Sequence, residues 1–349
     1  MVWTLDNYDD YLYKRLQIVT QQIKDSMVNH LNISRTQKSI EDSLSSGDFL
    51  PTVYIIEPTN HCNLNCTICP NSNIDKSKKG FMNLNDFELI LNGISPYAEF
   101  VMFYWLGEPM LHPLITEMLF LARENIKGKI VISTNMTISD DKIYRSLLKN
   151  SDVIICCLDK WDKVDYESIR RGADFEKVIS NIENLLSIRK KWKDGSEVVI
   201  KALDIDPYSK ESLSFNKYWQ EKGAKTMIAW KNDWAGTFPE LMNNLNIPAP
   251  ETQDRTACAD LWFKIVINWQ GSIQLCCFDW SNSFPIGTIH DSDWLYKTWQ
   301  SKILIEARKT HLQGDFSKIP ICKKCKTWGK KEEHTAYLNL NEDNYFLVF

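Results

Sequence analysis

The chain has 349 residues, which is long enough for one large domain and a smaller one. Hydrophobic residues make up 44% and charged residues 25%, as in an ordinary globular protein, and the net charge of −4 gives no basic footprint for a nucleic-acid partner. No apolar run approaches the length of a transmembrane helix, and the first residues carry no basic region before an apolar core, so neither a membrane partner nor a signal peptide is expected. Because disulfide frameworks fit small secreted domains, the ten cysteines are expected to be reduced, metal-binding thiols in a cytoplasmic protein.

The N-terminal residues carry a helical pattern. Residues 8–31 place apolar side chains at three- and four-residue steps, at Leu12, Leu16, Val19, Ile23 and Met27. A Ser-Ser-Gly-Asp run at residues 45–48 then interrupts the pattern. We therefore expect residues 1–50 to form a helical extension that docks on the main domain.

Three cysteines follow the first strand-like stretch, Val53 to Ile56. Cys62, Cys66 and Cys69 have the spacing C-x3-C-x2-C. Three thiolates in one short loop suit an iron–sulfur cluster, and a four-iron cluster held by three cysteines keeps one iron without a protein ligand. An open metal position is where chemistry takes place. A zinc site is the alternative, although zinc usually takes four ligands, commonly in two C-x2-C pairs.

The cysteine spacing and its position after a strand resemble those of the radical S-adenosylmethionine (SAM) enzymes. The resemblance implies that Cys62, Cys66 and Cys69 hold a [4Fe-4S] cluster whose open iron binds the amino and carboxylate groups of SAM. It further implies that the reduced cluster cleaves SAM to methionine and a 5′-deoxyadenosyl radical, which takes a hydrogen atom from an inert C–H bond. A reductant of the flavodoxin or ferredoxin type is then an expected partner.

Strand and helix patterns alternate from residue 52 to residue 230. Such alternation predicts a parallel sheet with helices outside it, most naturally closed as an open or partial barrel. The family resemblance implies the same α/β fold, a partial (β/α)6 barrel similar to a TIM barrel, which we place at residues 51–240. The expected strands are 53–57, 100–106, 129–133, 153–158, 198–203 and 226–230, and the expected helices lie near 84–93, 113–125, 140–149, 174–192 and 209–222.

Two strand ends resemble SAM-binding turns of the family. The Gly-Glu-Pro run that contains Gly107 and Glu108 resembles the loop that binds the methionine amino group; the family often has a further glycine where this chain has Leu106. The Ser-Thr-Asn run of Ser133 and Asn135 resembles a Thr-Asn turn near SAM, so both residues are assigned as cofactor contacts. A helix-capping role is the alternative for Asn135.

The fourth strand ends in two cysteines, Cys156 and Cys157, where the family often has a Ser-Leu-Asp run whose serine faces SAM. The resemblance therefore places Cys157 at the cofactor, and Cys156 faces the opposite side of the strand. A small core residue is the alternative for either thiol, and a lumen-facing Cys157 is also a candidate hydrogen-atom donor. Downstream, the resemblance assigns Arg170 to the SAM carboxylate in a charge-assisted pair. An exposed surface arginine is the alternative.

Lys201 interrupts the otherwise apolar fifth strand, Val198 to Leu203. Strands of a covered parallel sheet are apolar almost throughout. Burying the ammonium group against the helices would cost several kcal/mol, so we expect the side chain to face the barrel lumen. There it is a candidate for a substrate contact or a proton acceptor. The alternative is a lysine that extends out to water.

After residue 236 the pattern becomes loop-rich, and a domain boundary is expected near residue 240. Four thiolates in the remainder can hold a second, fully ligated four-iron cluster. These cysteines are Cys258, Cys276, Cys322 and Cys325. Their order resembles the twitch domain, the short form of the SPASM domain, which implies one auxiliary [4Fe-4S] cluster in a smaller domain at residues 241–349. Cys277 is expected to face away from this set, and structural zinc is the alternative occupant.

Together these features predict a radical SAM enzyme with one auxiliary cluster. The layout is similar to that of aminocyclitol dehydrogenase-type members, so the expected reaction is dehydrogenation or epimerisation of a sugar- or aminocyclitol-like alcohol. Dehydrogenation needs a base and an electron acceptor, whereas epimerisation needs a thiol that returns a hydrogen atom. A maturase of a ribosomally made peptide and a non-enzymatic iron–sulfur electron carrier are the alternatives. Several tryptophans lie near the domain junction: Trp230, Trp234, Trp262, Trp269 and Trp280. Aromatic faces would suit a sugar ring or a peptide side chain, but most of these residues are expected to belong to the core, and none is assigned to binding.

Overall fold

The computed structural model describes residues 50–192, 195–203, 209–229, 232–239, 258–325 and 337–338. The expected helix at residues 8–31 lies outside these residues. So does nearly all of the expected N-terminal extension, and so does the expected domain boundary at residue 240.

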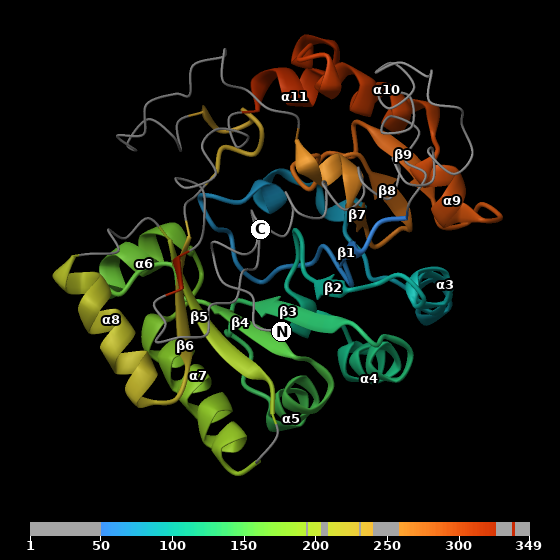
Figure 1. Ribbon diagram of the computed structural model, residues 1–349. Coiled ribbons are helices and arrows are strands. Elements are labelled where there is room, and N and C mark those ends of the chain that lie inside the picture. Colours follow the sequence, from blue (N-terminus) through green and yellow to red (C-terminus); the bar gives the residue numbers. More distant parts are fainter. Residues whose placement is uncertain are drawn as a thin grey trace, which may run out of the picture.

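The described strands form one ten-stranded sheet in the order β10-β6-β5-β4-β3-β2-β1-β7-β8-β9. Within it, β1 to β6 run parallel to one another and follow in chain order (Figure 1). These strands span Val53–Ile56 (β1), Phe100–Phe103 (β2), Lys129–Thr134 (β3), Val153–Cys157 (β4), Glu197–Leu203 (β5) and Lys225–Ala229 (β6). All six predicted strands are confirmed; β2 ends earlier than expected, because its last predicted residues belong to a loop.

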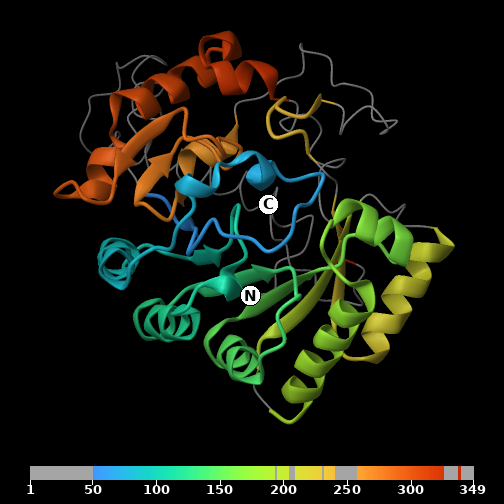
Figure 2. The ribbon, with the colours of Figure 1, turned by 180° about the vertical axis from the view of Figure 1, so that it is seen from behind.

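Helices connect the parallel strands and cover the outer face of the sheet (Figures 1 and 2). Short polar residues begin most of them: Asn83, Asp140, Asp174 and Ser209 each accept a backbone N–H of the first turn. The helices are α3 (Leu84–Ile94), α4 (Ile115–Asn125), α5 (Asp141–Asn150), α6 (Lys163–Ile169), α7 (Phe175–Lys190) and α8 (Lys210–Glu221), with 3-10 turns at Pro70–Asn73, Lys76–Lys78 and Pro109–Leu111. The expected α/β partial barrel is therefore confirmed.

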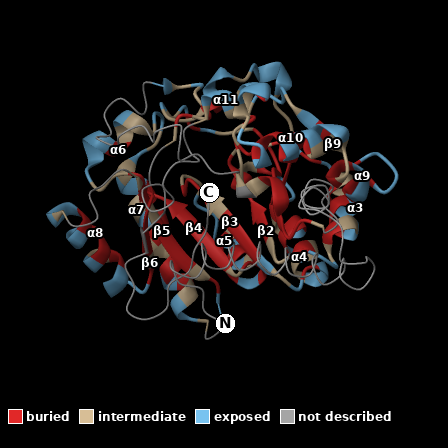
Figure 3. Ribbon diagram, turned by 45° about the horizontal axis from the view of Figure 1, so that its top comes forward, coloured by how far each residue is buried: buried red, intermediate tan, exposed pale blue. Residues whose placement is uncertain are grey.

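Successive strand residues alternate between two apolar layers. In β1, Tyr54 and Ile56 pack with the helices, whereas Val53 and Ile55 face the concave side of the sheet. The strands are accordingly buried on both faces, while the outer faces of the helices are exposed (Figure 3). The concave side is thus closed by side chains over most of its length and leaves room for a site at the ends of the strands.

The C-terminal part continues the same sheet. Strand β7 (Lys264–Ile267) pairs in parallel with β1, and β8 (Ser272–Gln274) and β9 (Pro285–Thr288) follow as antiparallel neighbours. Three helices and two 3-10 turns complete this part: α9 (Trp294–Trp299), α10 (Lys302–Leu312), α11 (Pro320–Lys324), Ala259–Trp262 and Phe316–Lys318. At the opposite edge, β10 (Tyr337–Leu338) pairs antiparallel with β6.

None of the described helices is both long enough and apolar enough to cross a lipid bilayer.

Candidate functional site

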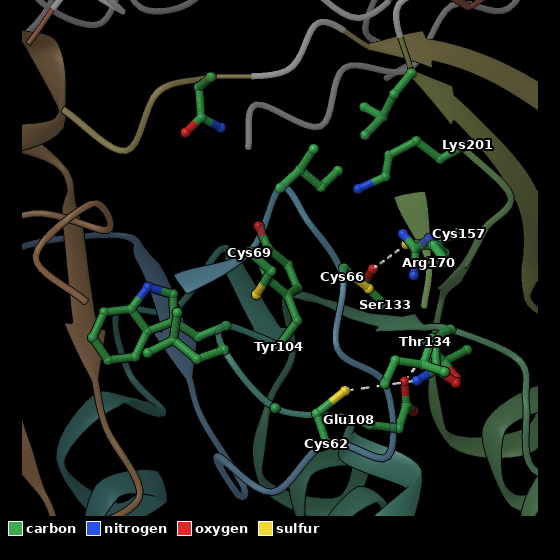
Figure 4. Close-up of a pocket in the computed structure, with 18 of the residues that line it drawn as sticks. Cys62, Cys66, Cys69, Tyr104, Glu108, Ser133, Thr134, Cys157, Arg170 and Lys201 are labelled. Atoms are coloured by element: carbon green, nitrogen blue, oxygen red, sulfur yellow. Dashed lines mark hydrogen bonds between the residues drawn. The ribbon is translucent and has the colours of Figure 1, made fainter. Parts of the chain in front are cut away.

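A pocket opens at the carboxyl ends of the parallel strands, where sheets of this kind carry their sites (Figure 4). Side chains from the loops after β1, β2, β3 and β4 meet in it, and so do residues of β5 and of the C-terminal part. Every residue predicted for the first metal centre, for SAM or for catalysis lines this pocket: Cys62, Cys66, Cys69, Gly107, Glu108, Ser133, Asn135, Cys157, Arg170 and Lys201. The topology therefore brings together residues that span 139 positions of the chain, from 62 to 201.

The cysteine loop is fixed by backbone hydrogen bonds to the C-terminal end of α6. The Asn65 N–H donates to the Arg171 carbonyl and the Thr67 N–H to the Ile169 carbonyl, both at 2.9 Å. Asn135 Nδ2 lies 3.9 Å from Cys62 Sγ. All three thiols are free of disulfides. The loop thus presents Cys62, Cys66 and Cys69 toward one space.

Three thiols that line one pocket are the kind of donor set that an iron–sulfur cluster takes. Burial raises the pKa of Cys66 to about 12 and that of Cys69 to about 11, and burial also raises the pKa of Cys62. Without a metal these groups are neutral at physiological pH, and a metal displaces their protons to bind the thiolates. The nearby charge of Arg170 opposes these rises and favours the thiolate forms.

The loop after β2 lies directly on the cysteine loop. A side chain at Gly107 would meet the backbone of Thr59 and Asn60, so only glycine allows this approach. Glu108 is buried, and its two carboxylate oxygens accept the N–H groups of Met110 at 3.1 Å and Asn135 at 2.7 Å. Burial raises the pKa of Glu108. Glu108 therefore joins the loops after β2 and β3 around the pocket.

Arg170 is held by a carboxylate that the sequence reading did not single out. Its Nε donates to Asp159 Oδ2 at 2.6 Å, and Asp159 is fully buried. The Arg170 side chain is 11% exposed and lines the pocket, so the expected alternative of a surface arginine is wrong. Burial opposes its charge, but Asp159 and the neighbouring thiols raise the pKa of Arg170 above its usual value. The guanidinium is therefore a fixed cation in the pocket wall.

The two thiols of β4 face opposite sides, as predicted. Cys156 packs in the layer under the helices, whereas Cys157 belongs to the concave layer and lines the pocket. Cys157 Sγ lies 3.2 Å from Ser133 Oγ. Lys201 extends from β5 into the same space (Figure 4), which is the lumen-facing placement that was expected.

Aromatic side chains form one wall of the pocket, beside the loops that carry the predicted metal and SAM contacts. Of these residues, only Trp234 was among the tryptophans noted in the sequence. The wall consists of Tyr104, Trp105, Trp234 and Phe278. Both indole N–H groups are occupied: Trp105 donates to the Cys277 carbonyl at 2.6 Å, and Trp234 donates to the Ile68 carbonyl at 2.9 Å. These rings are consequently held in place and offer their apolar surfaces to the pocket.

Cys277 was expected to face away from the C-terminal cysteine set. The residue lines the pocket, whereas Cys258, Cys276, Cys322 and Cys325 do not. Cys277 is a pocket residue that lies between the two predicted metal centres.

The second cysteine set gathers beside α10 and α11. The charges of Cys325 and Cys322 raise the pKa of Cys258 in addition to the larger effect of burial, and the charge of Cys258 raises that of Cys276. None of these thiols is in a disulfide. Cys258 therefore lies within electrostatic reach of each of the other three thiols, which fits a shared cluster.

In the part of the chain that the structure describes, no three His, Cys, Asp or Glu side chains are arranged to hold a single metal ion. A four-iron cluster makes a different demand, because each of its cysteines binds a separate iron.

Family comparisons agree with these two centres. Residues 56–195 match the Radical SAM superfamily, and residues 258–326 match SPASM, an iron–sulfur cluster-binding domain. Among curated proteins, GTP 3′,8-cyclases of Clostridium botulinum are 24% identical over 154 residues, which is 43% of this chain and 48% of the relative. The chain thus spans about half the length of the curated relatives it matches.

Solved structures share the fold at low sequence identity. BtrN in complex with AdoMet and 2-DOIA aligns with a TM-score of 0.57 and 18% identity, over 83% of this chain and 99% of BtrN. Streptococcus suis SuiB bound to the precursor peptide SuiA aligns with a TM-score of 0.60 and 15% identity, over 84% of this chain and 78% of SuiB. Native anSMEcpe with bound AdoMet aligns with a TM-score of 0.56 and 18% identity, over 81% of this chain and 92% of anSMEcpe. By the family matches, the chain carries a radical SAM domain at residues 56–195 and an iron–sulfur cluster-binding domain of the SPASM type at residues 258–326.

Proposed function

We propose that the pocket binds SAM and a small alcohol and that the enzyme oxidises or epimerises this alcohol at a C–H bond. The observation that carries the proposal is the shared pocket, which is lined by three free thiols, a fixed arginine, an aromatic wall and a lysine. The thiols and the arginine suit a cluster and the polar end of SAM, and the aromatic wall and the lysine suit a ring-shaped substrate.

The proposal assigns separate residues to the first cluster and to each end group of SAM. Cys62, Cys66 and Cys69 hold the first cluster, and Arg170 pairs with the SAM carboxylate. The loop of Gly107 and Glu108 takes the SAM amino group. When bound, the first cluster and SAM supply a hydrogen-abstracting 5′-deoxyadenosyl radical, and the auxiliary cluster supplies an electron acceptor.

The chain's own groups then decide the outcome at the substrate. The aromatic wall excludes water and holds the ring against the SAM side of the pocket. In dehydrogenation, the substrate carbon loses a hydrogen atom, the proton of its hydroxyl group passes to a base, for which Lys201 is the candidate, and the remaining electron would go to the electron acceptor. In epimerisation, Cys157 would return a hydrogen atom to that carbon from the other face, and its sulfur radical would then take up a proton and an electron from the external reductant.

The small-alcohol substrate is supported by the extent of the structural matches. The aligned region covers 99% of BtrN, whose complex contains 2-DOIA, but 78% of SuiB, whose complex contains a precursor peptide. A peptide substrate is the second candidate, because SuiB and anSMEcpe both have peptide complexes. The aromatic wall would accept a peptide side chain through the same apolar surfaces.

The first test is SAM cleavage by anaerobically reconstituted protein with dithionite. We expect release of 5′-deoxyadenosine, an iron content of about eight per chain, and loss of cleavage in Cys66→Ala. Cys156→Ala is the matched control, because this thiol packs under the helices, away from the pocket. Absence of 5′-deoxyadenosine from the wild-type protein would reject the enzyme proposal.

The second test identifies the substrate class. Deuterated aminocyclitols and deuterated peptides are offered separately, and transfer of deuterium into 5′-deoxyadenosine marks the substrate. Product analysis of Cys157→Ala then separates the two outcomes, since an unchanged product would exclude Cys157 as the hydrogen donor.

A further inference from the structure

Arg308 of α10 is a buried guanidinium without an acidic partner in the part of the chain that the structure describes. The residue has no exposed surface. Its Nε donates to the Leu261 carbonyl and its Nη1 to the Trp299 carbonyl, both at 2.9 Å, and its Cζ lies 4.2 Å from the centre of the Trp299 ring. Its Nη2 is buried and has no hydrogen-bond acceptor among the described residues.

A buried charge of this kind is costly unless an opposite charge lies near it. Burial lowers the pKa of Arg308 to about 9, so the group remains charged at neutral pH. Two carbonyl oxygens and an aromatic face stabilise the guanidinium in part. A negative group in the metal-loaded protein would stabilise it further.

The surroundings of Arg308 point to the C-terminal cysteine set. Leu261, which accepts from Arg308, lies three residues after Cys258 in the same 3-10 segment. One turn after Arg308 on α10, His311 Nδ1 accepts the N–H of Cys258 at 3.1 Å. Helix α10 therefore holds the Cys258 segment at two points, and Arg308 is at one of them.

The other described cations near this cysteine set are either paired with a carboxylate or exposed to water. Lys264 forms an ion pair with Asp260 at 2.8 Å, so these two charges offset each other. Lys323 and Lys324 are exposed on α11, where water screens their charge. Arg308 combines full burial with the lack of a carboxylate partner among the described residues.

We infer that Arg308 is a positioning residue that offsets the negative charge of the auxiliary cluster and raises its reduction potential. This inference rests on the proposed assignment of Cys258, Cys276, Cys322 and Cys325 as the ligands. Four thiolates leave the cluster with net negative charge, which increases by one on reduction, and net charge is one of the factors that set the potential. A buried cation favours the reduced state, which suits an electron acceptor in a dehydrogenation.

The test measures the midpoint potential of the auxiliary cluster by redox titration followed by electron paramagnetic resonance. The parent is the full chain with Cys62, Cys66 and Cys69 changed to Ala, so that the auxiliary cluster gives the signal. We expect Arg308→Gln to shift the midpoint potential to a more negative value and Arg308→Lys to remain close to the parent. Arg145→Gln, at an exposed position of α5, is the matched control and should leave the potential unchanged.

Each result decides the inference. An unchanged potential in Arg308→Gln with full iron content would overturn it, as would loss of the cluster from Arg308→Lys, which keeps the charge. Loss of the cluster from Arg308→Gln alone would support it, because the charge would then be required for binding. The titration uses neither SAM nor substrate, so it is independent of the proposed reaction. A parent without a cluster would reject the ligand assignment and, with it, the inference.

Discussion

Three carboxylates buried around the strand ends organise the site without facing solvent. Glu57, Glu108 and Asp159 are 1%, 2% and 0% exposed, respectively. Glu57 and Glu108 accept backbone N–H groups from two loops each, and Asp159 accepts from Arg170. These contacts fix loops and a cation before any ligand binds, which is the preorganisation that a binding site requires.

Asp159→Asn tests whether this carboxylate positions Arg170. An amide gives a weaker, uncharged bond to the guanidinium, so Arg170 should lose its fixed orientation. A charged hydrogen bond contributes about 1.5–3 kcal/mol, and we expect SAM to bind roughly 10- to 100-fold more weakly by calorimetry. Asp165→Asn, at an exposed position of α6, should bind SAM as the wild type does. Tighter binding by Asp159→Asn would show instead that Asp159 competes with SAM for Arg170.

The raised pKa of Glu57 predicts that the folded state loses stability as the pH rises. Burial raises its pKa from 4.5 to about 7, although the N–H groups of Trp269 and Leu106 oppose the rise. The folded state therefore binds the proton more tightly than the unfolded state does. The stabilisation that this group contributes is fully present below pH 4.5 and is lost as the pH rises through 7. The loss is on the order of 3 kcal/mol.

Glu57→Gln does not titrate, so the difference in melting temperature between wild type and variant should change with pH. We expect the wild type to lose stability relative to the variant between pH 5.5 and 8 in anaerobic thermal unfolding. Glu88→Gln, at an exposed position of α3, should show no such trend. Parallel pH profiles for wild type and Glu57→Gln would contradict the prediction.

The sequence predicted those site residues that belong to a local pattern and missed those whose partners are distant. Cys62, Cys66 and Cys69 define a spacing within eight residues, so the sequence alone locates them. Glu57 accepts a hydrogen bond from the Trp269 N–H, which is 212 positions away, and no local sequence pattern predicts a contact over that distance. The same reason explains why Trp105 was not expected in the pocket, since its bond to Cys277 spans 172 positions.

At the scale of elements, prediction succeeded where a repeating pattern was long enough. The parallel strands and the helices of ten or more residues that connect them were found, because apolar periodicity is the main local signal. Helix α10 also has eleven residues but was not predicted. Helix α6 has seven residues, too few for its period to stand out, and was missed. Strands β7 to β9 have three or four residues each, and their stability depends on pairing with β1 across the fold.

Gly107→Ala tests the contact between the loops after β1 and β2. The added methyl group would meet the Thr59 carbonyl, and neither backbone segment can move away easily. We expect destabilisation of about 1–3 kcal/mol, with reduced iron at the first cluster and weakened SAM binding, as read by thermal unfolding, iron content and calorimetry. Gly195→Ala is the control, because its new methyl group would make only ordinary contact with Arg189. Normal iron content and SAM affinity in Gly107→Ala would show that the loops tolerate separation.

At the scale of the whole molecule, the first strand is shared by both iron–sulfur regions. Strand β1 pairs in parallel with β2 on one side and with β7 on the other. Side chains reinforce the junction, since Glu57 accepts from Trp269 and Trp105 donates to Cys277. One sheet therefore supports both cysteine sets, and a disturbance of β1 should reach each of them.

Hydrogen exchange can show whether the two regions open together. Because β7 is hydrogen-bonded to β1 within a continuous sheet, we expect the amides of β7 to exchange as slowly as those of β1 to β3 in the reconstituted protein. A proline in place of Val266 should accelerate exchange in β1 as well as in β7, because Val266 pairs with Ile55. Proline in place of Lys210, in the first turn of α8, is the control, where proline is tolerated. Exchange of β7 to β9 as a separate, faster unit would mean that the C-terminal part opens independently and that the shared sheet does not couple the two centres.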